Sequence, residues 1–279
     1  MRKRVLITGE NSYIGDSFCK YTTEYFDTDV IDVVDDKWKD ADFSVYDAVV
    51  HVAAIVHKQE KNYTQHQYYK VNTDLAVEIA DKAKNSGVGQ FVFLSTMSVY
   101  GVINGVVDKN TELKPFNSYG KSKLKAEKLL KELSDDKFVV TNVRPPIVYG
   151  KGCKGNYNDL ASFARKMPFF PEYKSERSMI YIDNLCEFIK KCIDENLSGN
   201  FCPQDKSYVN TSHMVKLVAD ANGKKIRLTK VFNLFITLAL KMKITVVQKV
   251  FGSLTYDKDL CPDFDKVDFE TAIKRTEQK

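Results

Sequence analysis

The chain has 279 residues, of which 43% are hydrophobic, 28% charged and 12% aromatic. This composition is typical of a folded, water-soluble protein and excludes a disordered or fibrous chain. The 42 lysines and arginines against 37 acidic residues give a formal charge of +5. Because the basic residues are dispersed along the chain, we expect no nucleic-acid partner.

Short β-branched runs alternate with longer helical patterns in the first half of the chain. We expect strands at 5–7, 30–31, 48–52, 91–94 and 139–143, and helices at 14–26, 64–86 and 118–134. This alternation predicts an α/β fold, a doubly wound parallel sheet with helices on both faces. After Gly150 the alternation stops, so we predict one domain over 1–150 and a smaller C-terminal substrate-binding region over 151–279, interleaved with the first.

A glycine-containing turn, Thr8–Gly15, follows the first predicted strand and opens the first predicted helix. Gly9 permits a tight turn, and Gly15 lets the helix pack closely on the sheet. The start of the helix presents N–H groups and the positive end of the helix dipole, which suit a pyrophosphate. The segment therefore predicts a dinucleotide site, with an ordinary strand-to-helix turn as the alternative.

The turn resembles that of the extended short-chain dehydrogenases/reductases, in particular the NAD-dependent epimerase/dehydratase family, whose pattern is T-G-x-x-G-x-x-G. Ser12 replaces the middle glycine. Its Cβ crowds the approach to phosphate, whereas its hydroxyl can donate a hydrogen bond. The resemblance implies a Rossmann-type fold with NAD bound by the domain 1–150. The residues of the turn implied to contact NAD are Gly9, Asn11, Ser12, Tyr13, Ile14 and Gly15.

Acidic residues near the end of the second predicted strand indicate which dinucleotide is bound. Asp32 ends that strand, whereas Asp35 already belongs to a loop. A carboxylate at this place accepts hydrogen bonds from the adenosine ribose and repels a 2′-phosphate, so Asp32 favours NAD over NADP. The resemblance adds Asp42 and Phe43 as contacts of the adenine.

Tyr119 and Lys123 are four residues apart in the predicted helix 118–134, so their side chains share one helical face. A lysine cation near a phenol lowers the phenol pKa from about 10, which makes tyrosine a usable general base. The same spacing also occurs by chance on amphipathic helices. The resemblance makes Thr96 the third catalytic residue and a substrate contact, with strand-end capping as the alternative for Ser95 and Thr96.

Further matches extend the resemblance over nearly the whole chain. The other residues implied to line the cofactor site are Val52, Ala53, Ala54, Asn72, Ser95, Tyr119, Lys123 and Pro145. Asn156 and Arg177 match the region that binds the sugar nucleotide, where an arginine holds a diphosphate with its planar fork of donors. A surface ion pair is the alternative for Arg177. Ile147 stands where many members have a substrate-binding asparagine.

The longest apolar stretch, 231–242, is shorter than the ~20 residues that span a bilayer, so we predict no transmembrane segment. We expect residues 231–251 to pack in the core, with a lid over the nucleotide or a membrane-surface contact as alternatives. The six cysteines and four histidines show no metal-ligand spacing, so we predict no metal site and reduced thiols in a cytoplasmic protein.

The resemblance leaves several reactions to separate. Family dehydratases carry Asp-Glu directly after the catalytic threonine, whereas this chain has Met97 and Ser98. Neither side chain exchanges a proton near neutral pH, so we reject dehydration.

We predict an epimerase that oxidises C4 of a UDP-hexose or UDP-N-acetylhexosamine transiently with NAD. The alternatives are an NAD(P)H-dependent reductase of a 4-keto-6-deoxy sugar nucleotide and an inactive nucleotide-binding scaffold. The resemblance also implies polysaccharide biosynthesis and a homodimer formed through helices 64–86 and 118–134.

Overall fold

The computed structural model describes residues 2–56, 62–260 and 266–278. The chain forms two compact units that exchange segments. Unit 1 comprises Met1–Gly101, Glu112–Pro145 and Leu185–Pro203, and unit 2 comprises Val102–Thr111, Pro146–Asn184 and Gln204–Lys279. The chain therefore passes between the units several times.

Unit 1 is built on a six-stranded sheet in which neighbouring strands are parallel. In sheet order the strands are β10 (Gly199–Phe201), β6 (Val139–Val143), β4 (Gln90–Leu94), β3 (Ala48–His51), β1 (Lys3–Thr8) and β2 (Phe26–Ile31). Every residue of β3 and β4 is buried, as expected where helices cover both faces of a parallel sheet. This architecture confirms the predicted Rossmann-type fold.

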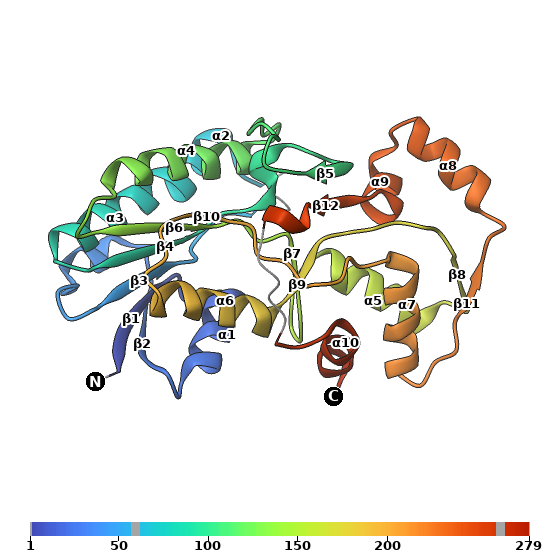
Figure 1. Ribbon diagram of the computed structural model, residues 1–279, viewed down its shortest axis with the longest axis horizontal. Coiled ribbons are helices and arrows are strands. Elements are labelled where there is room, and N and C mark those ends of the chain that lie inside the picture. The colour runs from blue at the N-terminus through green and yellow to red at the C-terminus, as the bar shows by residue number, and fades with distance from the viewer. Residues whose placement is uncertain (1, 57–61, 261–265, 279) are drawn as a thin grey trace. The chain divides into compact units, whose positions relative to one another are not determined.

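Helices pack on both faces of this sheet (Figure 1). One face carries α2 (Gln65–Tyr69), the π-turn η3 (Lys70–Asp74), α3 (Leu75–Asn85) and α4 (Ser118–Leu133), and the other carries α1 (Tyr13–Thr22) and α6 (Ile182–Asp194). Ile79 of α3 and Leu130 of α4 pack in one buried cluster with Val49 and Phe91 of the sheet. Two short 3-10 helices, η1 (Asp36–Asp40) and η4 (Met97–Tyr100), follow β2 and β4.

One predicted boundary is wrong. The helix expected to reach residue 26 ends at Thr22, and the chain enters β2 at Phe26. β2 is the edge strand of the sheet, and its Asp27 and Asp29 are exposed. Charged residues are common on edge strands, where they discourage pairing with another chain, and they remove the apolar pattern by which a strand is predicted.

Unit 2 contains short strands that pair in parallel and a set of helices. The pairs are β5 (Gly105–Val107) with β12 (Leu254–Tyr256), β7 (Ile147–Tyr149) with β9 (Met179–Tyr181), and β8 (Phe169–Pro171) with β11 (Arg227–Thr229). The helices are α5 (Asn156–Lys166), α7 (Thr211–Ala221), α8 (Asn233–Lys241), α9 (Thr245–Phe251), η5 (Lys258–Leu260) and α10 (Phe269–Glu277). The buried Asp205 joins several of these segments, since it accepts hydrogen bonds from Tyr149 (2.8 Å) and Asn184 (2.9 Å).

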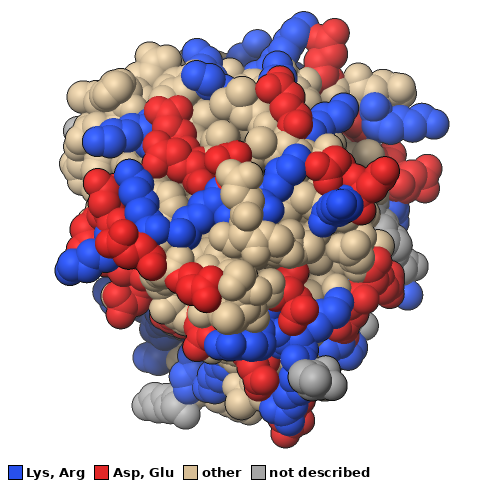
Figure 2. Space-filling model, turned by 90° about the vertical axis from the view of Figure 1, so that its left-hand side faces the viewer, with Lys and Arg blue, Asp and Glu red and all other residues tan. Residues whose placement is uncertain are grey.

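Charged side chains of both signs are interspersed over the face drawn in Figure 2. Lys and Arg on this face lie next to Asp and Glu, and neither sign forms a continuous stripe. Among the helices of the described residues, none is long and apolar enough to cross a membrane.

Candidate active site

The predicted phosphate turn connects β1 to α1 at the carboxyl end of the sheet. Gly9 has a φ of +120°, and a Cβ at this position would lie 2.9 Å from the backbone nitrogen of Ala53. Space is also restricted at Gly15, where a Cβ would lie 3.1 Å from a methyl carbon of Ile7. Both glycines therefore have the close-packing roles that the sequence predicted.

Ser12 has a local role in the same turn. It is the N-cap of α1, and its hydroxyl oxygen accepts a hydrogen bond from the Gly15 N–H at 3.4 Å. Asn11 precedes it with a left-handed φ of 58°. The Ser12 hydroxyl hydrogen remains a donor beside the helix start, so replacing the usual glycine leaves the turn intact and adds a polar group to it.

The carboxyl end of β3 lies directly against this turn. The backbone N–H groups of Val52 and Ala53 both donate to the Thr8 carbonyl, at 3.1 and 3.0 Å. His51 is fully buried next to them, and its Nδ1 lies 2.7 Å from the Thr8 hydroxyl oxygen. Its ring lies 5.9 Å from that of Phe91. Burial lowers the pKa of His51 to about 3, so the imidazole is neutral near pH 7.

The acidic residues expected near the ribose differ in what they bind. Asp32 is exposed directly after β2 and accepts a hydrogen bond from the Val34 N–H at 3.0 Å. Asp35 caps η1 and forms an ion pair with Lys37 at 3.0 Å. The Asp35 carboxylate is therefore engaged by a helix cap and by a lysine, and the Asp32 carboxylate by a backbone N–H.

The two residues expected at the adenine lie in different surroundings. Asp42 is exposed and accepts hydrogen bonds from the Ser44 hydroxyl (2.7 Å) and N–H (2.9 Å). These bonds hold the Asp42 pKa below its usual range. Phe43 is buried in the core with the Lys82 ammonium 5.0 Å from its ring centre, so its ring contributes to packing.

Tyr119, Lys123 and Thr96 come together beyond the carboxyl end of β4. Thr96 follows β4 and forms a hydrogen bond with Tyr119 at the start of α4. The Lys123 ammonium, one turn further along α4, donates to the Leu94 carbonyl at 2.7 Å. Tyr119 is 8% exposed and Lys123 1% exposed. The structure therefore brings together the three residues predicted to be catalytic.

Burial dominates the protonation of this cluster. It raises the pKa of Tyr119 to about 12, and the hydrogen bond with Thr96 opposes that shift in part. Burial lowers the pKa of Lys123 to about 7, and the Glu127 carboxylate acts in the opposite direction. The pKa of Tyr119 is therefore raised and not lowered as we expected from Lys123, because burial disfavours the phenolate.

Gly120 makes the approach of these elements possible. A Cβ on Gly120 would lie 2.7 Å from the Ser98 carbonyl oxygen of η4 and 2.9 Å from the Pro115 Cβ. The Asn117 side chain caps α4 by accepting from the Gly120 N–H at 2.8 Å. Without a side chain at 120, η4 and the start of α4 can lie in contact, which brings Thr96 next to Tyr119.

Asn72 connects this cluster to the end of β3. Its side chain accepts from the Ile55 N–H (2.8 Å) and donates to the Ile55 carbonyl (2.9 Å) and the Ser122 hydroxyl (3.1 Å). The residue is fully buried within η3. The amide that the resemblance implied to line the cofactor site is therefore engaged by the protein itself, and it joins the end of β3 to α4.

A buried ion pair lies below the cluster and was not predicted from the sequence. Arg144 donates to Glu127 at 2.6 and 3.0 Å and to the Tyr100 hydroxyl at 2.9 Å. Ser95, predicted as a cofactor contact, donates its hydroxyl hydrogen to Glu127. The spacing carried a usable signal, because Glu127 is four residues after Lys123 and eight after Tyr119, on the same face of α4.

Backbone contacts complete the end of the sheet. The Pro145 carbonyl, after β6, accepts from the Met97 N–H at 3.0 Å. Ala54 is partly exposed beyond β3. Tyr13 and Ile14, in the first turn of α1, are partly exposed as well. These residues therefore line the same edge of the sheet as the glycine turn, the edge at which open α/β sheets bind their ligands.

Arg177 and Asn156, the residues predicted to bind the sugar nucleotide, belong to unit 2. Arg177 is buried, and one of its terminal nitrogens donates to the Gln248 carbonyl. Among the described residues its buried Nε has no hydrogen-bond partner. Burial lowers the pKa of Arg177 to about 10. The alternative expected from the sequence, a surface ion pair, is wrong, because the guanidinium is buried and donates to a backbone carbonyl. Asn156 begins α5, and its side chain lies outside the described part of the structure.

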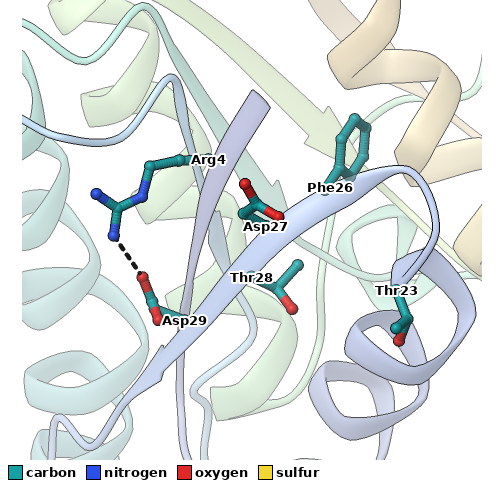
Figure 3. A pocket seen from close by; sticks show the side chains of 6 residues that line it. All are labelled: Arg4, Thr23, Phe26, Asp27, Thr28 and Asp29. Atoms are coloured by element: carbon teal, nitrogen blue, oxygen red, sulfur yellow. Dashed lines mark hydrogen bonds and ion pairs between the residues drawn. The ribbon is translucent and has the colours of Figure 1, made fainter. Parts of the chain in front are cut away.

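A shallow depression of about 530 Å³ lies at the amino ends of β1 and β2, the opposite end of the strands from the predicted site (Figure 3). Arg4 of β1 and residues 26–29 of β2 line it, and Arg4 forms an ion pair with Asp29 at 3.1 Å. The depression is therefore separate from the predicted site. In the described residues, no group of His, Cys, Asp and Glu side chains is arranged to hold a metal ion.

A doubly wound sheet with a glycine turn after β1 and a Tyr-Lys-Thr cluster after β4 defines a dinucleotide-dependent enzyme of the short-chain dehydrogenase/reductase type. The model of the NAD dependent epimerase/dehydratase family matches residues 5–200. The chain belongs to this family, and its cofactor is NAD.

Curated relatives and solved structures agree with this assignment. The chain is 31% identical over 253 residues to a UDP-glucose 4-epimerase of Vibrio cholerae, which covers 80% of this chain and 77% of the relative. It is 29% identical over 250 residues to an N-acetyl-α-D-glucosaminyl-diphospho-ditrans,octacis-undecaprenol 4-epimerase of Escherichia coli O157:H7, covering 81% and 74%. A Bacillus cereus UDP-glucuronic acid 4-epimerase solved with NAD has a TM-score of 0.74 at 17% identity, covering 98% of this chain and 97% of the other. A Bacillus anthracis dTDP-4-dehydrorhamnose reductase solved with NADP has a TM-score of 0.71 at 19% identity, covering 99% of both.

Proposed function

We propose that the protein is an NAD-dependent 4-epimerase of a nucleotide-linked hexose, a UDP-hexose or UDP-N-acetylhexosamine. The observation that carries the proposal is the hydrogen bond between Thr96 and Tyr119, one helical turn from the buried Lys123. The similarity to the Vibrio cholerae UDP-glucose 4-epimerase over most of both chains supports it.

Tyr119 is the proposed acid and base of the reaction. It removes the proton from the 4-hydroxyl of the sugar and later returns a proton to the same oxygen, while Thr96 donates a hydrogen bond to that oxygen or to the phenolate. When bound, NAD would supply a reversible acceptor for the C4 hydride and a positive charge that would lower the pKa of a nearby phenol. Return of the hydride to the opposite face of the 4-keto sugar gives the C4 epimer with no net oxidation.

Lys123 supplies positive charge to this site and is the proposed contact of the nicotinamide ribose. Because burial lowers its pKa to about 7, the amine is only partly protonated near neutral pH. Glu127 favours the charged form, and any negative charge that develops on Tyr119 favours it further. Deprotonation of the phenol and protonation of the amine therefore reinforce each other.

The proposed cofactor and substrate contacts divide between the two units. In unit 1 the turn Gly9–Gly15 and Asp32 are proposed to hold the diphosphate and the adenosine ribose. The fit is supported by the restricted space at Gly9 and by the exposed carboxylate after β2. In unit 2 the buried Nε of Arg177, with no partner among the described residues, supports its proposed contact with the sugar-nucleotide diphosphate. Asn156 is proposed as a substrate contact from the family resemblance alone.

The second candidate is a reductase of a 4-keto-6-deoxy sugar nucleotide. It would use the same Tyr119 as an acid and NAD(P)H as the hydride donor. The chain is 26% identical over 212 residues to a Pseudomonas aeruginosa UDP-2-acetamido-2,6-β-L-arabino-hexul-4-ose reductase, which supports this alternative. The match spans only 51% of the length of that reductase, so we place the epimerase first. An inactive scaffold would have no need to keep the Tyr119, Lys123 and Thr96 cluster.

We also propose a homodimer that pairs through α4 and the stretch from α2 to α3, in the cytoplasm and in a polysaccharide pathway. This part of the proposal rests on the family resemblance alone. Sedimentation of the purified protein measures the oligomeric state directly.

The reaction is tested by incubating the purified protein with sugar substrates in the absence of added reductant. The panel contains UDP-glucose, UDP-N-acetylglucosamine and N-acetylglucosaminyl-diphospho-undecaprenol, and NMR measures the ratio of C4 epimers. We expect one of them to interconvert with its epimer, and Tyr119→Phe to lower the rate by about 100-fold or more. Tyr25→Phe is the matched control, because Tyr25 is half exposed and packs under Lys190.

Different results select different conclusions. Consumption of NAD(P)H by 4-keto sugars without interconversion would select the reductase. Full turnover by Tyr119→Phe would remove both enzyme assignments as proposed.

A further inference from the structure

Residues 231–246 of unit 2 expose large apolar side chains instead of packing them in the core. Val231, Leu234, Phe235, Leu238, Met242 and Val246 are each more than half exposed, with Leu234 at 77% and Phe235 at 69%. They belong to α8, its flanking residues and the start of α9 (Figure 1). This corrects our expectation that 231–251 forms ordinary core.

The exposed residues share one face of a helix. Leu234, Phe235 and Leu238 lie within α8. Val231 and Met242, which flank the helix, continue the spacing i, i+3, i+4, i+7 and i+11 that places helical side chains on one stripe. The rest of α8 holds it to unit 2: Ile236 is buried, Thr237 lies 3.3 Å from the Tyr173 hydroxyl, and Asn233 donates to the Glu172 carbonyl at 3.0 Å. The apolar stripe therefore faces solvent because the opposite face is the anchored one.

The segment that carries this stripe has charges of a single sign, and the exposed Glu172, outside the segment, pairs with one of them, Lys230, at 3.8 Å. Residues 221–256 contain no Asp or Glu. The same segment contains seven basic residues, namely Lys224, Lys225, Arg227, Lys230, Lys241, Lys243 and Lys249. All seven are exposed. Long basic side chains next to an apolar stripe can extend along it and keep their charge in water.

We propose that α8 and α9 dock the protein on the surface of an anionic lipid bilayer, with the apolar stripe in the interface and the basic residues at the headgroups. A short helix with an apolar face and flanking cations is suited to lie in such an interface. α8 has 9 residues, so it is roughly 14 Å long and lies on the bilayer instead of spanning its ~30 Å core.

A second copy of the chain is a less suitable occupant. Two identical faces of this kind would bring two sets of seven cations together, with no acidic residue of the same segment to neutralise them. Anionic headgroups supply the opposite charge. The proposal does not depend on the reaction that the protein catalyses, and its test contains no sugar substrate.

The test is co-sedimentation of the full chain with lipid vesicles. Vesicles of phosphatidylcholine alone are compared with vesicles that also contain phosphatidylglycerol. We expect binding to the anionic vesicles, weakened by added salt, and about tenfold weaker binding to the neutral ones. The double variant Leu234→Ser with Phe235→Ser should bind the anionic vesicles about tenfold less tightly. Lys241→Gln with Lys243→Gln should lose affinity for the anionic vesicles only.

Val106→Ser is the matched control, since Val106 is a half-exposed apolar residue on β5 of the same unit, and it should bind like the wild type. Circular dichroism establishes that each variant is folded. Wild-type protein that stays in the supernatant with anionic vesicles would overturn the proposal, as would equal binding by the Leu234 and Phe235 variant. A dimer that this variant dissociates, without vesicle binding by the wild type, would assign the stripe to a second copy.

Discussion

Lys123 is a buried lysine, and burial disfavours the charged form of its amine. Its ammonium is 1% exposed, donates to the Leu94 carbonyl and lies 4.3 Å from the centre of the Phe93 ring. The carbonyl and the ring face compensate part of the lost hydration, yet the pKa still falls to about 7. A residue kept at such a cost is expected at a functional site rather than in a structural core.

Replacing this lysine should therefore separate activity from stability. Lys123→Met is expected to lower the epimerase rate by about 100-fold or more, because the cation beside Tyr119 is lost. A wild-type lysine with a folded pKa near 7 and an unfolded pKa near 10.4 adds stability that is fully present above about pH 10 and lost as pH falls to 7.

Urea unfolding at pH 7 and pH 9 measures this difference. The free energy of unfolding of the wild type should gain about 1 kcal/mol per pH unit from Lys123 over this range, a gain that the Met variant lacks. The same rise in wild type and variant would show that Lys123 is not the titrating group.

At the scale of elements, the position of Thr96 depends on how η4 meets the segment before α4. Gly101 ends η4 with a φ of 69°, and a Cβ there would lie 1.9 Å from the Lys114 carbonyl oxygen. The chain passes so close at this point that only a residue without a side chain fits. The contact holds η4, and thereby Thr96, beside the helix that carries Tyr119.

Gly101→Ala should destabilise the protein by about 3 kcal/mol or more, because the backbone must move to relieve the overlap. Gly87→Ala is the matched control: Gly87 also has a positive φ, of 83°, but a Cβ there meets no atom within 4 Å. The control should lose only about 1–2 kcal/mol, the cost of the left-handed backbone. Equal losses of unfolding free energy in Gly101→Ala and Gly87→Ala would mean that the backbone at Lys114 moves at little cost to make room for the Cβ.

At the scale of the whole molecule, the free energy of unfolding should depend on pH through His51, which is buried in unit 1. His51 is fully buried with a pKa of about 3, compared with about 6.5 in an unfolded chain. Its contribution to stability is therefore fully present above pH 6.5 and is lost as pH falls toward 3. Protonation would place a cation beside the Phe91 and Phe93 rings without a counter-charge from the Thr8 hydroxyl.

We expect the wild type to lose about 2 kcal/mol of unfolding free energy through His51 between pH 7.5 and pH 5. His51→Gln keeps a hydrogen-bonding side chain and does not titrate, so its loss over the same interval should be smaller by that amount. Denaturant unfolding at the two pH values provides the comparison. A variant whose stability falls as steeply as that of the wild type would assign the effect to other groups.

The sequence by itself determined the features that depend on neighbours along the chain. The Thr8–Gly15 turn, the pairing of Tyr119 with Lys123 on one helical face and the buried parallel strands all follow from local spacing. The start of β2 was missed, because the charges of an edge strand hide the apolar pattern.

Only the tertiary structure decided the features that depend on segments far apart in the chain. The sequence did not reveal that Glu127 is paired with Arg144, that Gly120 lets η4 approach α4, or that burial dominates the pKa of Tyr119. It also left open which side of α8 faces unit 2. Spacing specifies which side chains share a face, whereas packing specifies what that face meets, and burial and charge follow from the latter.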